Sequence, residues 1–179
     1  MKFSFVAAGP NADLDEREGK KSVGAWPPLG ILYLAAVLEK RGVEVSVLDQ
    51  AAQGFTLKET ISWIKAENPD ILGFSTFASS GRTAALISSE VKKENPNVVV
   101  VFGNYYATFN PERILRKYPS VDIIVRGEAE RTVIDLVDWF EDRRRLKEVL
   151  GISFRNGNAV VSTADRPLIE DLDSLPFPD

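Results

Sequence analysis

The chain of 179 residues contains neither cysteine nor histidine. Without cysteine, this polypeptide can form no disulfide, thiolate zinc site, iron–sulfur cluster or cysteine nucleophile. Without histidine, Ser-His-Asp triads, histidine-ligated metals and imidazole acid–base catalysis are excluded as well. Most of the common catalytic machinery is therefore missing from this chain.

Excess charge of one sign and long apolar runs are also lacking. The 22 Lys and Arg residues against 26 Asp and Glu give a net charge of −4, which removes the main electrostatic reason to expect a nucleic acid or an anionic membrane as partner. No apolar run approaches the roughly 20 residues of a membrane span, and Gly9-Pro10 interrupts the N-terminal segment too early for a signal peptide. We therefore expect a cytoplasmic globular protein that binds neither nucleic acid nor membrane.

Five short apolar, β-rich runs alternate with longer helical stretches. The expected strands are Lys2–Ala8, Glu44–Leu48, Ile71–Ser75, Val98–Phe102 and Val121–Val125. The fourth run is apolar at every position, which is typical of a strand covered by helices on both faces. Repetition of strand and helix with short returns predicts right-handed crossovers and an α/β, doubly wound parallel sheet.

The helices are bounded by recognisable start and stop signals. The first begins at Pro27-Pro28 and ends at Arg41-Gly42, because proline suits the first helical turn and glycine suits the residue after the last. The others are expected at Leu57–Glu67, Arg82–Glu94, Pro111–Lys117 and Glu130 to about Arg145.

The C-terminal part follows a different pattern. Ile152–Arg155 and Ala159–Thr163 flank Asn156-Gly157, a dipeptide suited to a tight β-hairpin turn. The last residues, from Arg166 on, contain three prolines and no periodicity, which favours a strap or linker. We expect an α/β domain over residues 1–148 and a small β hairpin with a strap over 149–179.

Ligands of open α/β sheets bind beyond the carboxyl ends of the strands. After the third strand, hydroxyl and small side chains let a ligand approach the backbone and the next helix N-terminus; the candidates are Ser75, Thr76, Phe77 and Ser79. Alternatively, Ser79 or Ser80 only caps the helix. The long, charged first loop, Gly9 to Trp26, is expected to be a lid, a binding loop or a solvated mobile segment.

The loops after the fourth and fifth strands give further candidates. Gly103, Asn104, Tyr105 and Thr108 follow the fourth strand, where tyrosine rings offer flat surfaces to a large planar ligand unless one belongs to the edge of the core. Gly127 and Glu128 follow the fifth, and the carboxylates of Glu128 and Glu130 either bind a ligand or favour the helix start.

Two nucleotide-type functions do not fit. The first turn, Ala7 to Asn11, has no G-x-G-x-x-G pattern, which argues against a dinucleotide-binding fold despite Asp49 at the end of the second strand. A phospho-receiver needs acidic residues after the first strand, Asp after the third and Lys after the fifth. The sequence has Ala-Gly, Ser-Thr and Arg-Gly at these places.

Six short motifs together resemble a known family. They are Pro27–Gly30, Leu48-Asp49, Gly73–Thr76, Gly103–Thr108, Val121–Glu130 and Asp171–Pro178. In order and spacing they resemble the N-terminal cobalamin-binding domain of cobalamin-dependent radical S-adenosylmethionine enzymes, which are methyltransferase-like. One departure is clear: the fourth loop of relatives often reads Gly-Gly-x-His-x-Thr, whereas this chain has Asn104 at the second glycine and Tyr106 at the histidine.

The resemblance implies a flavodoxin-like, five-stranded parallel sheet of order 2-1-3-4-5. Cobalamin would lie over the strand ends, with its nucleotide tail beside the third and fourth strands. The residues expected to bind it are the ten loop candidates above, and no catalytic or metal-binding residue is expected. Because the chain has no histidine, cobalamin would be held with neither histidine nor its own dimethylbenzimidazole on cobalt (His-off and base-off).

The family also implies a partner. S-adenosylmethionine and a 4Fe-4S cluster would belong to a C-terminal radical S-adenosylmethionine domain that is missing from this chain and acts in cis or in trans. The parent would then be a methyltransferase, although some relatives catalyse cyclisation or ring rearrangement. The alternative is a non-catalytic α/β interaction domain that kept the fold and lost cobalamin, since fold alone does not fix function.

Overall fold

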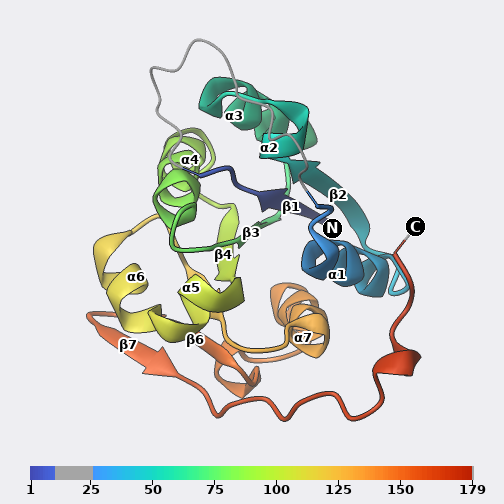
Figure 1. The fold of residues 1–179 in the computed structure, drawn as a ribbon. Helices are drawn as coiled ribbons and strands as arrows, with labels where there is room; N and C mark the ends of the chain where they lie inside the picture. Colours follow the sequence, from blue (N-terminus) through green and yellow to red (C-terminus); the bar gives the residue numbers. More distant parts are fainter. Residues whose placement is uncertain (11–25, 179) are drawn as a thin grey trace.

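The computed structural model of the chain describes residues 1–10 and 26–178 (Figure 1). The expectation for the charged first loop concerns residues 11–25 and therefore lies outside the described residues. No helix in the described ranges is long and apolar enough to cross a membrane.

One seven-stranded sheet forms the centre of the molecule, in the order β2-β1-β3-β4-β5-β6-β7. The first five strands pair in parallel and have the predicted order 2-1-3-4-5. The strands are β1 (Lys2–Ala7), β2 (Glu44–Asp49), β3 (Ile71–Ser75), β4 (Val99–Gly103), β5 (Ile123–Val125), β6 (Ile152–Asn156) and β7 (Ala159–Ser162). The flavodoxin-like prediction is thus confirmed.

The predicted C-terminal hairpin is confirmed and is more closely integrated than expected. Strand β6 pairs antiparallel with β5, with Ile124 opposite Ser153, and β7 pairs antiparallel with β6. Gly157 has a φ of 59° in the connecting turn, a conformation that suits glycine. The hairpin therefore extends the parallel sheet by two strands.

Helices cover both faces of the sheet (Figure 1). One face carries α1 (Leu29–Glu39) and α7 (Glu130–Phe140), and the other carries α3 (Leu57–Glu67), α4 (Gly81–Glu94) and α6 (Pro111–Lys117). Two short helices, α2 (Gln50–Gln53) and α5 (Asn104–Phe109), directly follow β2 and β4. Single 3₁₀ turns occupy Leu146–Glu148 and Leu172–Ser174.

Most element boundaries differ from the prediction by one or two residues, and the short helix α2 was not predicted. The segment after the fourth strand, expected to be a loop, is the helix α5. Helix α7 ends at Phe140 rather than near Arg145, and Asp142 just beyond it has a φ of 58°, outside the helical region. Strand β5 begins at Ile123, two residues later than predicted.

The alternation of side chains along the strands separates two cores. Phe3 and Phe5 of β1 point to the face of α1 and α7, whereas Leu72 and Phe74 of β3 point to the face of α3 and α4. We call these the α1/α7 face and the α3/α4 face. On the α3/α4 face, Phe74 and Phe102 meet edge to face with ring centroids 5.4 Å apart, within the range that favours aromatic pairs.

Candidate functional site

A pocket of about 820 Å³ opens at the carboxyl edge of the parallel strands and extends down the α1/α7 face. Its lining comes from the ends of β1, β3, β4 and β5 and from the N-terminal parts of α1, α5 and α7. This is the edge at which ligands bind in open α/β sheets, and the volume falls in the range of small-molecule sites.

Phenylalanine rings and a glycine form the floor of the pocket. Phe3 and Phe5 stack with ring centroids 4.4 Å apart. A Cβ atom added at Gly73 would lie 2.8 Å from Cδ1 of Phe5 and 3.0 Å from Cε1 of Phe3. Only glycine therefore leaves room for both rings on this side of β3.

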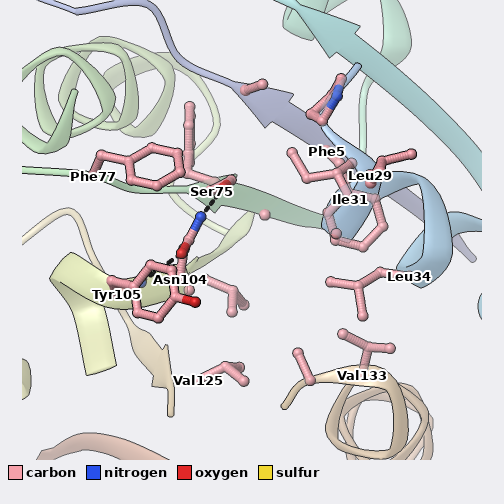
Figure 2. A pocket seen from close by; sticks show the side chains of 18 of the residues that line it. Phe5, Leu29, Ile31, Leu34, Ser75, Phe77, Asn104, Tyr105, Val125 and Val133 are labelled. Atoms are coloured by element: carbon pink, nitrogen blue, oxygen red, sulfur yellow. Dashed lines mark hydrogen bonds between the residues drawn. The ribbon is translucent and has the colours of Figure 1, made fainter. Parts of the chain in front are cut away.

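The side walls are apolar as well. Figure 2 shows Leu29, Ile31 and Leu34 of α1 across the pocket from Phe77 and Tyr105, with Val125 and Val133 at another side. Apolar walls with a few polar groups are typical of cofactor pockets.

Large apolar side chains are exposed around the pocket mouth. Trp26 is 89% exposed, Phe109 76% and Tyr105 70%, and all three line the pocket. Leu29, Phe77 and Leu168 are exposed at the same site. An exposed apolar patch of this kind marks a ligand or partner surface.

Asn104 explains how the chain tolerates its departure from the second glycine of the related loops. Its φ is 74°, in the left-handed region where asparagine is the most tolerated residue after glycine. Its side chain donates from Nδ2 to Oγ of Ser75 (2.8 Å) and accepts from the backbone N–H of Tyr105 (2.7 Å), as Figure 2 shows. Asn104 thus connects the ends of β3 and β4 at the pocket.

The structure brings eight of the ten predicted site residues to the pocket. These are Ser75, Phe77, Gly103, Asn104, Tyr105, Thr108, Gly127 and Glu128. Thr76 is fully buried and donates from Oγ1 to the carbonyl oxygen of Gly103 (2.8 Å), so it joins two strand ends instead of lining the pocket. Ser79 is exposed and lies outside the lining, and Oγ of Ser80 accepts from the N–H of Phe77 (3.1 Å).

Further lining residues went unnoticed in the sequence. Phe3 and Phe5 belong to the first expected strand and were not named as site candidates, and Leu168 belongs to the strap. One available signal was Gly73 itself, since a glycine inside an apolar strand marks a close approach by another group. Glu130, whose carboxylate was expected either to bind a ligand or to favour the helix start, lines the pocket, and its Oε2 is buried without a hydrogen-bond partner among the described residues.

Four helices that begin around the pocket have no side-chain cap. No side-chain bond caps the N-terminus of α1, α4, α5 or α7, whereas α3 carries a complete capping box between Thr56 and Glu59. Uncapped N-termini leave backbone N–H groups for other acceptors. At α5 two of these groups are used within the chain, because the N–H of Tyr105 donates to Oδ1 of Asn104 and the N–H of Tyr106 donates to the carbonyl oxygen of Thr76.

A comparison with protein families matches the B12 binding domain over residues 19–137. The chain belongs to the B12-binding domain family. The resemblance to cobalamin-binding modules of radical S-adenosylmethionine enzymes is therefore confirmed.

Curated relatives cover most of this chain. It is 37% identical over 160 residues to the uncharacterized methyltransferase PH0819 of Pyrococcus horikoshii, covering 89% of this chain and 35% of that protein. It is 34% identical over 149 residues to the anaerobic magnesium-protoporphyrin IX monomethyl ester cyclase of Synechocystis, covering 82% of this chain and 30% of the cyclase. The chain thus spans about a third of the length of these relatives.

Solved structures share the fold. The cobalamin-dependent S-adenosylmethionine radical enzyme OxsB, with aqua-cobalamin and S-adenosylmethionine bound, superimposes with a TM-score of 0.74 at 24% identity, covering 93% of this chain and 22% of OxsB. TsrM of Kitasatospora setae, a radical S-adenosylmethionine methyltransferase, gives a TM-score of 0.73 at 18% identity, covering 91% of this chain and 30% of TsrM.

The residues of the pocket fit a cobalamin. Its corrin macrocycle is broad, with a rim of amide groups, and the pocket offers apolar walls and an acceptor, Oε2 of Glu130, that lacks a partner. Among the described residues, and apart from Gly103 and its two chain neighbours, no atom lies within 4 Å of a Cβ built on Gly103. The backbone of the fourth strand end is thus open to close approach by a ligand, as glycine permits.

Proposed function

We propose that this chain is the cobalamin-binding module of a radical S-adenosylmethionine methyltransferase and holds the cofactor in the pocket at the carboxyl edge. The observation that carries the proposal is the open apolar pocket bordered by Gly103 and Tyr105, in a chain of the B12-binding domain family. No specific observation favours the alternative of an interaction domain that has lost cobalamin.

The proposed binding residues are those predicted from the sequence. Ser75, Asn104 and Thr108 would present polar atoms, Gly103 and Gly127 would allow close backbone approach, and the exposed rings of Phe77 and Tyr105 would cover the cofactor. Glu128 lines the same wall. Thr76 and Ser79 lie outside the lining, in the segment that follows β3, and would contribute to binding from there. The nucleotide tail would occupy the apolar part beside β3 and β4. When bound, cobalamin supplies a cobalt centre that carries a methyl group.

A second domain is part of the proposal. S-adenosylmethionine and a 4Fe-4S cluster would belong to a radical domain in cis or in trans. The similarity to OxsB, a cobalamin-dependent S-adenosylmethionine radical enzyme, and the larger size of the relatives support this domain. Residues 1–148 would form the binding unit, and 149–179 the hairpin and strap toward that domain. Cytoplasmic residence stays a prediction.

A cobalt without a protein imidazole also follows from this proposal. The chain has no histidine, and carboxylates and amides are weaker partners for cobalt. With the dimethylbenzimidazole held away, the lower axial site would hold water or nothing. Electron paramagnetic resonance of the Co(II) form should show no axial nitrogen splitting, and nitrogen superhyperfine lines would contradict the base-off state.

The direct test of the function is retention of hydroxocobalamin. The protein is mixed with the cofactor, free ligand is removed by gel filtration, and the corrin absorption of the protein fraction is measured. We expect a retained spectrum that saturates near one cofactor per chain. Bovine serum albumin treated in the same way controls for nonspecific adsorption, and no retention beyond this control would favour the interaction-domain alternative.

A further inference from the structure

Glu130 carries a polar atom that the protein itself leaves unused. It is the first residue of α7 and lines the pocket. Within residues 1–10 and 26–178, the buried side-chain nitrogen and oxygen atoms without a hydrogen-bond partner are Oε2 of Glu130 and Nε of Arg126. Only Glu130 of these two lines the pocket.

Several other polar side chains of the pocket are already engaged within the protein. Ser75 and Asn104 bond to each other, and Oγ1 of Thr108 accepts from the N–H of Gly127 (3.2 Å). Oε2 of Glu128 accepts from the N–H of Ile169 (2.7 Å), which ties the strap to the pocket wall. Oδ1 of Asp49 accepts from the N–H of Ala52 (3.0 Å).

Arg126 does not supply the missing donor. Its Nη1 pairs with Asp165, and its Nη2 donates to the carbonyl oxygen of Thr163 (2.6 Å). No ion pair joins Arg126 to Glu130 among the described residues. Both Nη atoms are thus committed to the strap and hairpin, and Nε, which also lacks a partner, makes no hydrogen bond to Glu130.

A buried acceptor without a donor is unfavourable. Leaving such a group unsatisfied costs more than a hydrogen bond gains, and the cost rises for charged groups. The neighbouring lining residues, Ala129 just before α7 and Val133 on it, are apolar and offer no hydrogen bond from their side chains. The N-terminus of α7 favours a negative charge at this position, but the buried oxygen still lacks a donor. Among residues 1–10 and 26–178 no donor meets this oxygen, whereas a group that enters the pocket can supply one.

We propose that Oε2 of Glu130 accepts a hydrogen bond from a peripheral amide N–H of the corrinoid, and that this residue makes the pocket select amide-bearing corrinoids over their carboxylate forms. The inference rests on the proposed function, because it requires cobalamin in the pocket. Hydrolysis of that amide to a carboxylate removes the donor and sets two negative groups against each other. Glu130 is thus a specificity residue rather than part of the fold's support.

The test compares two variants and two kinds of ligand. Dissociation constants are measured for hydroxocobalamin and for the set of its monocarboxylic acids, in each of which one peripheral amide is hydrolysed. The wild type should bind one of these acids about tenfold or more weakly than hydroxocobalamin, as expected for loss of a charge-assisted hydrogen bond. In Glu130→Gln this ratio should fall to about threefold or less, because a neutral amide no longer repels the carboxylate.

A matched control and a second readout separate this role from a structural one. Glu39→Gln removes an exposed carboxylate at the other end of α1 and should keep the wild-type ratio. In the absence of ligand, Glu130→Gln should unfold at the same or a higher temperature than the wild type, because Oε2, the oxygen at stake, has no donor among the described residues. If Glu130 supported the fold, its replacement by Gln would lower the unfolding temperature.

The outcomes are decisive in each case. If the wild type does not bind hydroxocobalamin at all, the proposed function fails. If the wild type binds it but no acid shows a ratio that depends on Glu130, the function stands and the inference is wrong. A clear loss of thermal stability in ligand-free Glu130→Gln would also overturn it, because the carboxylate would then serve the fold.

Discussion

The two faces of the sheet are built from the same strands but differ in how completely helices fill them. On the α3/α4 face, fully buried side chains such as Leu72, Phe102 and Ile87 form a continuous core. On the α1/α7 face, the C-terminal ends of the helices are joined by the pair Arg41–Asp138 (2.9 Å). Their N-terminal halves border the pocket instead.

The alternation of β3 explains part of this difference. Leu72 and Phe74 supply large side chains to the α3/α4 face, whereas Gly73 between them supplies none to the other. Phe3 and Phe5 occupy part of the space above Gly73 and form a flat floor. One strand can thus provide a packed core on one side and a ligand surface on the other.

The largest expected effect is on the filled face. Phe102 is fully buried, and Phe102→Ala should cost about 3–5 kcal/mol in the free energy of unfolding, a large share of a domain's total. Tyr105→Ala at the pocket mouth should change it by less than about 0.5 kcal/mol, because this ring is 70% exposed. Urea denaturation measures both, and equal losses would refute the contrast between the faces.

A glycine pair tests the floor of the pocket. Gly73→Ala places a Cβ 2.8 Å from the ring of Phe5 and should destabilise by about 1–3 kcal/mol, since the rings must shift. Gly30→Ala is the control, because its Cβ meets no atom within 4 Å and alanine favours a helix by about 0.5–1 kcal/mol. If both variants were equally stable, the packing of Phe3 and Phe5 over Gly73 would be wrong.

A smaller effect on stability is expected at the capping box of α3, since the helices around the pocket have no side-chain cap. Thr56 accepts from the N–H of Glu59 (3.2 Å), and Glu59 accepts from the N–H of Thr56 (2.8 Å). These bonds from Thr56 hold the pKa of Glu59 below its usual range. Thr56→Ala should cost about 1 kcal/mol, whereas Thr56→Ser should retain most of the cap. A thermal melt in which both variants match the wild type would contradict the capping box.

The smallest effect concerns the amino edge, opposite the pocket. Lys2 pairs with Glu67 (2.7 Å) and Glu44 (2.9 Å). Its hydrogen bond to Glu67 holds the pKa of that carboxyl below 4.5 and raises the pKa of Lys2 above 10.5. The stabilisation by Glu67 is therefore present above pH 4.5 and is lost as pH falls below it.

The variant Glu67→Gln tests how this stabilisation by Glu67 depends on pH. Its melting temperature should lie slightly below that of the wild type at pH 7, and the difference should shrink as the pH falls below 4.5. Thermal melts at several pH values from about 3 to about 7 measure this difference in melting temperature, because that range spans the titration of a carboxyl group. A difference that grows on acidification would contradict the sign of the pKa shift.

Much of the fold followed from the sequence because its signals are local. The apolar run Val98–Phe102 predicted an interior strand, and β4 pairs with β3 and β5. Asn156-Gly157 predicted the hairpin, although pairing of β6 with β5 depends on distant contacts. Helix α5 was missed because it has only six residues and its start depends on the left-handed Asn104 and the N–H of Tyr106 bonding to the carbonyl of Thr76.

The residues at the rim of the candidate site were predictable from the sequence, whereas the floor of the pocket was not. Parallel strands bring their carboxyl ends together, so Ser75, Gly103 and Gly127 could be assigned to one edge from order alone. The floor required knowing that Phe3 and Phe5 leave space between α1 and α7. The unpartnered oxygen of Glu130 appears only when every neighbouring hydrogen bond is known.

The most direct test of the account is the affinity of Gly103→Val for hydroxocobalamin, measured by equilibrium titration beside the wild type. We expect the fold to accept the new side chain, because a Cβ at Gly103 meets no atom within 4 Å among the described residues beyond its chain neighbours and the φ of −134° suits valine. We expect an unchanged melting temperature and binding at least about tenfold weaker, since valine would fill the space the ligand needs. Equal affinity in a folded variant would mean that cobalamin does not occupy this pocket.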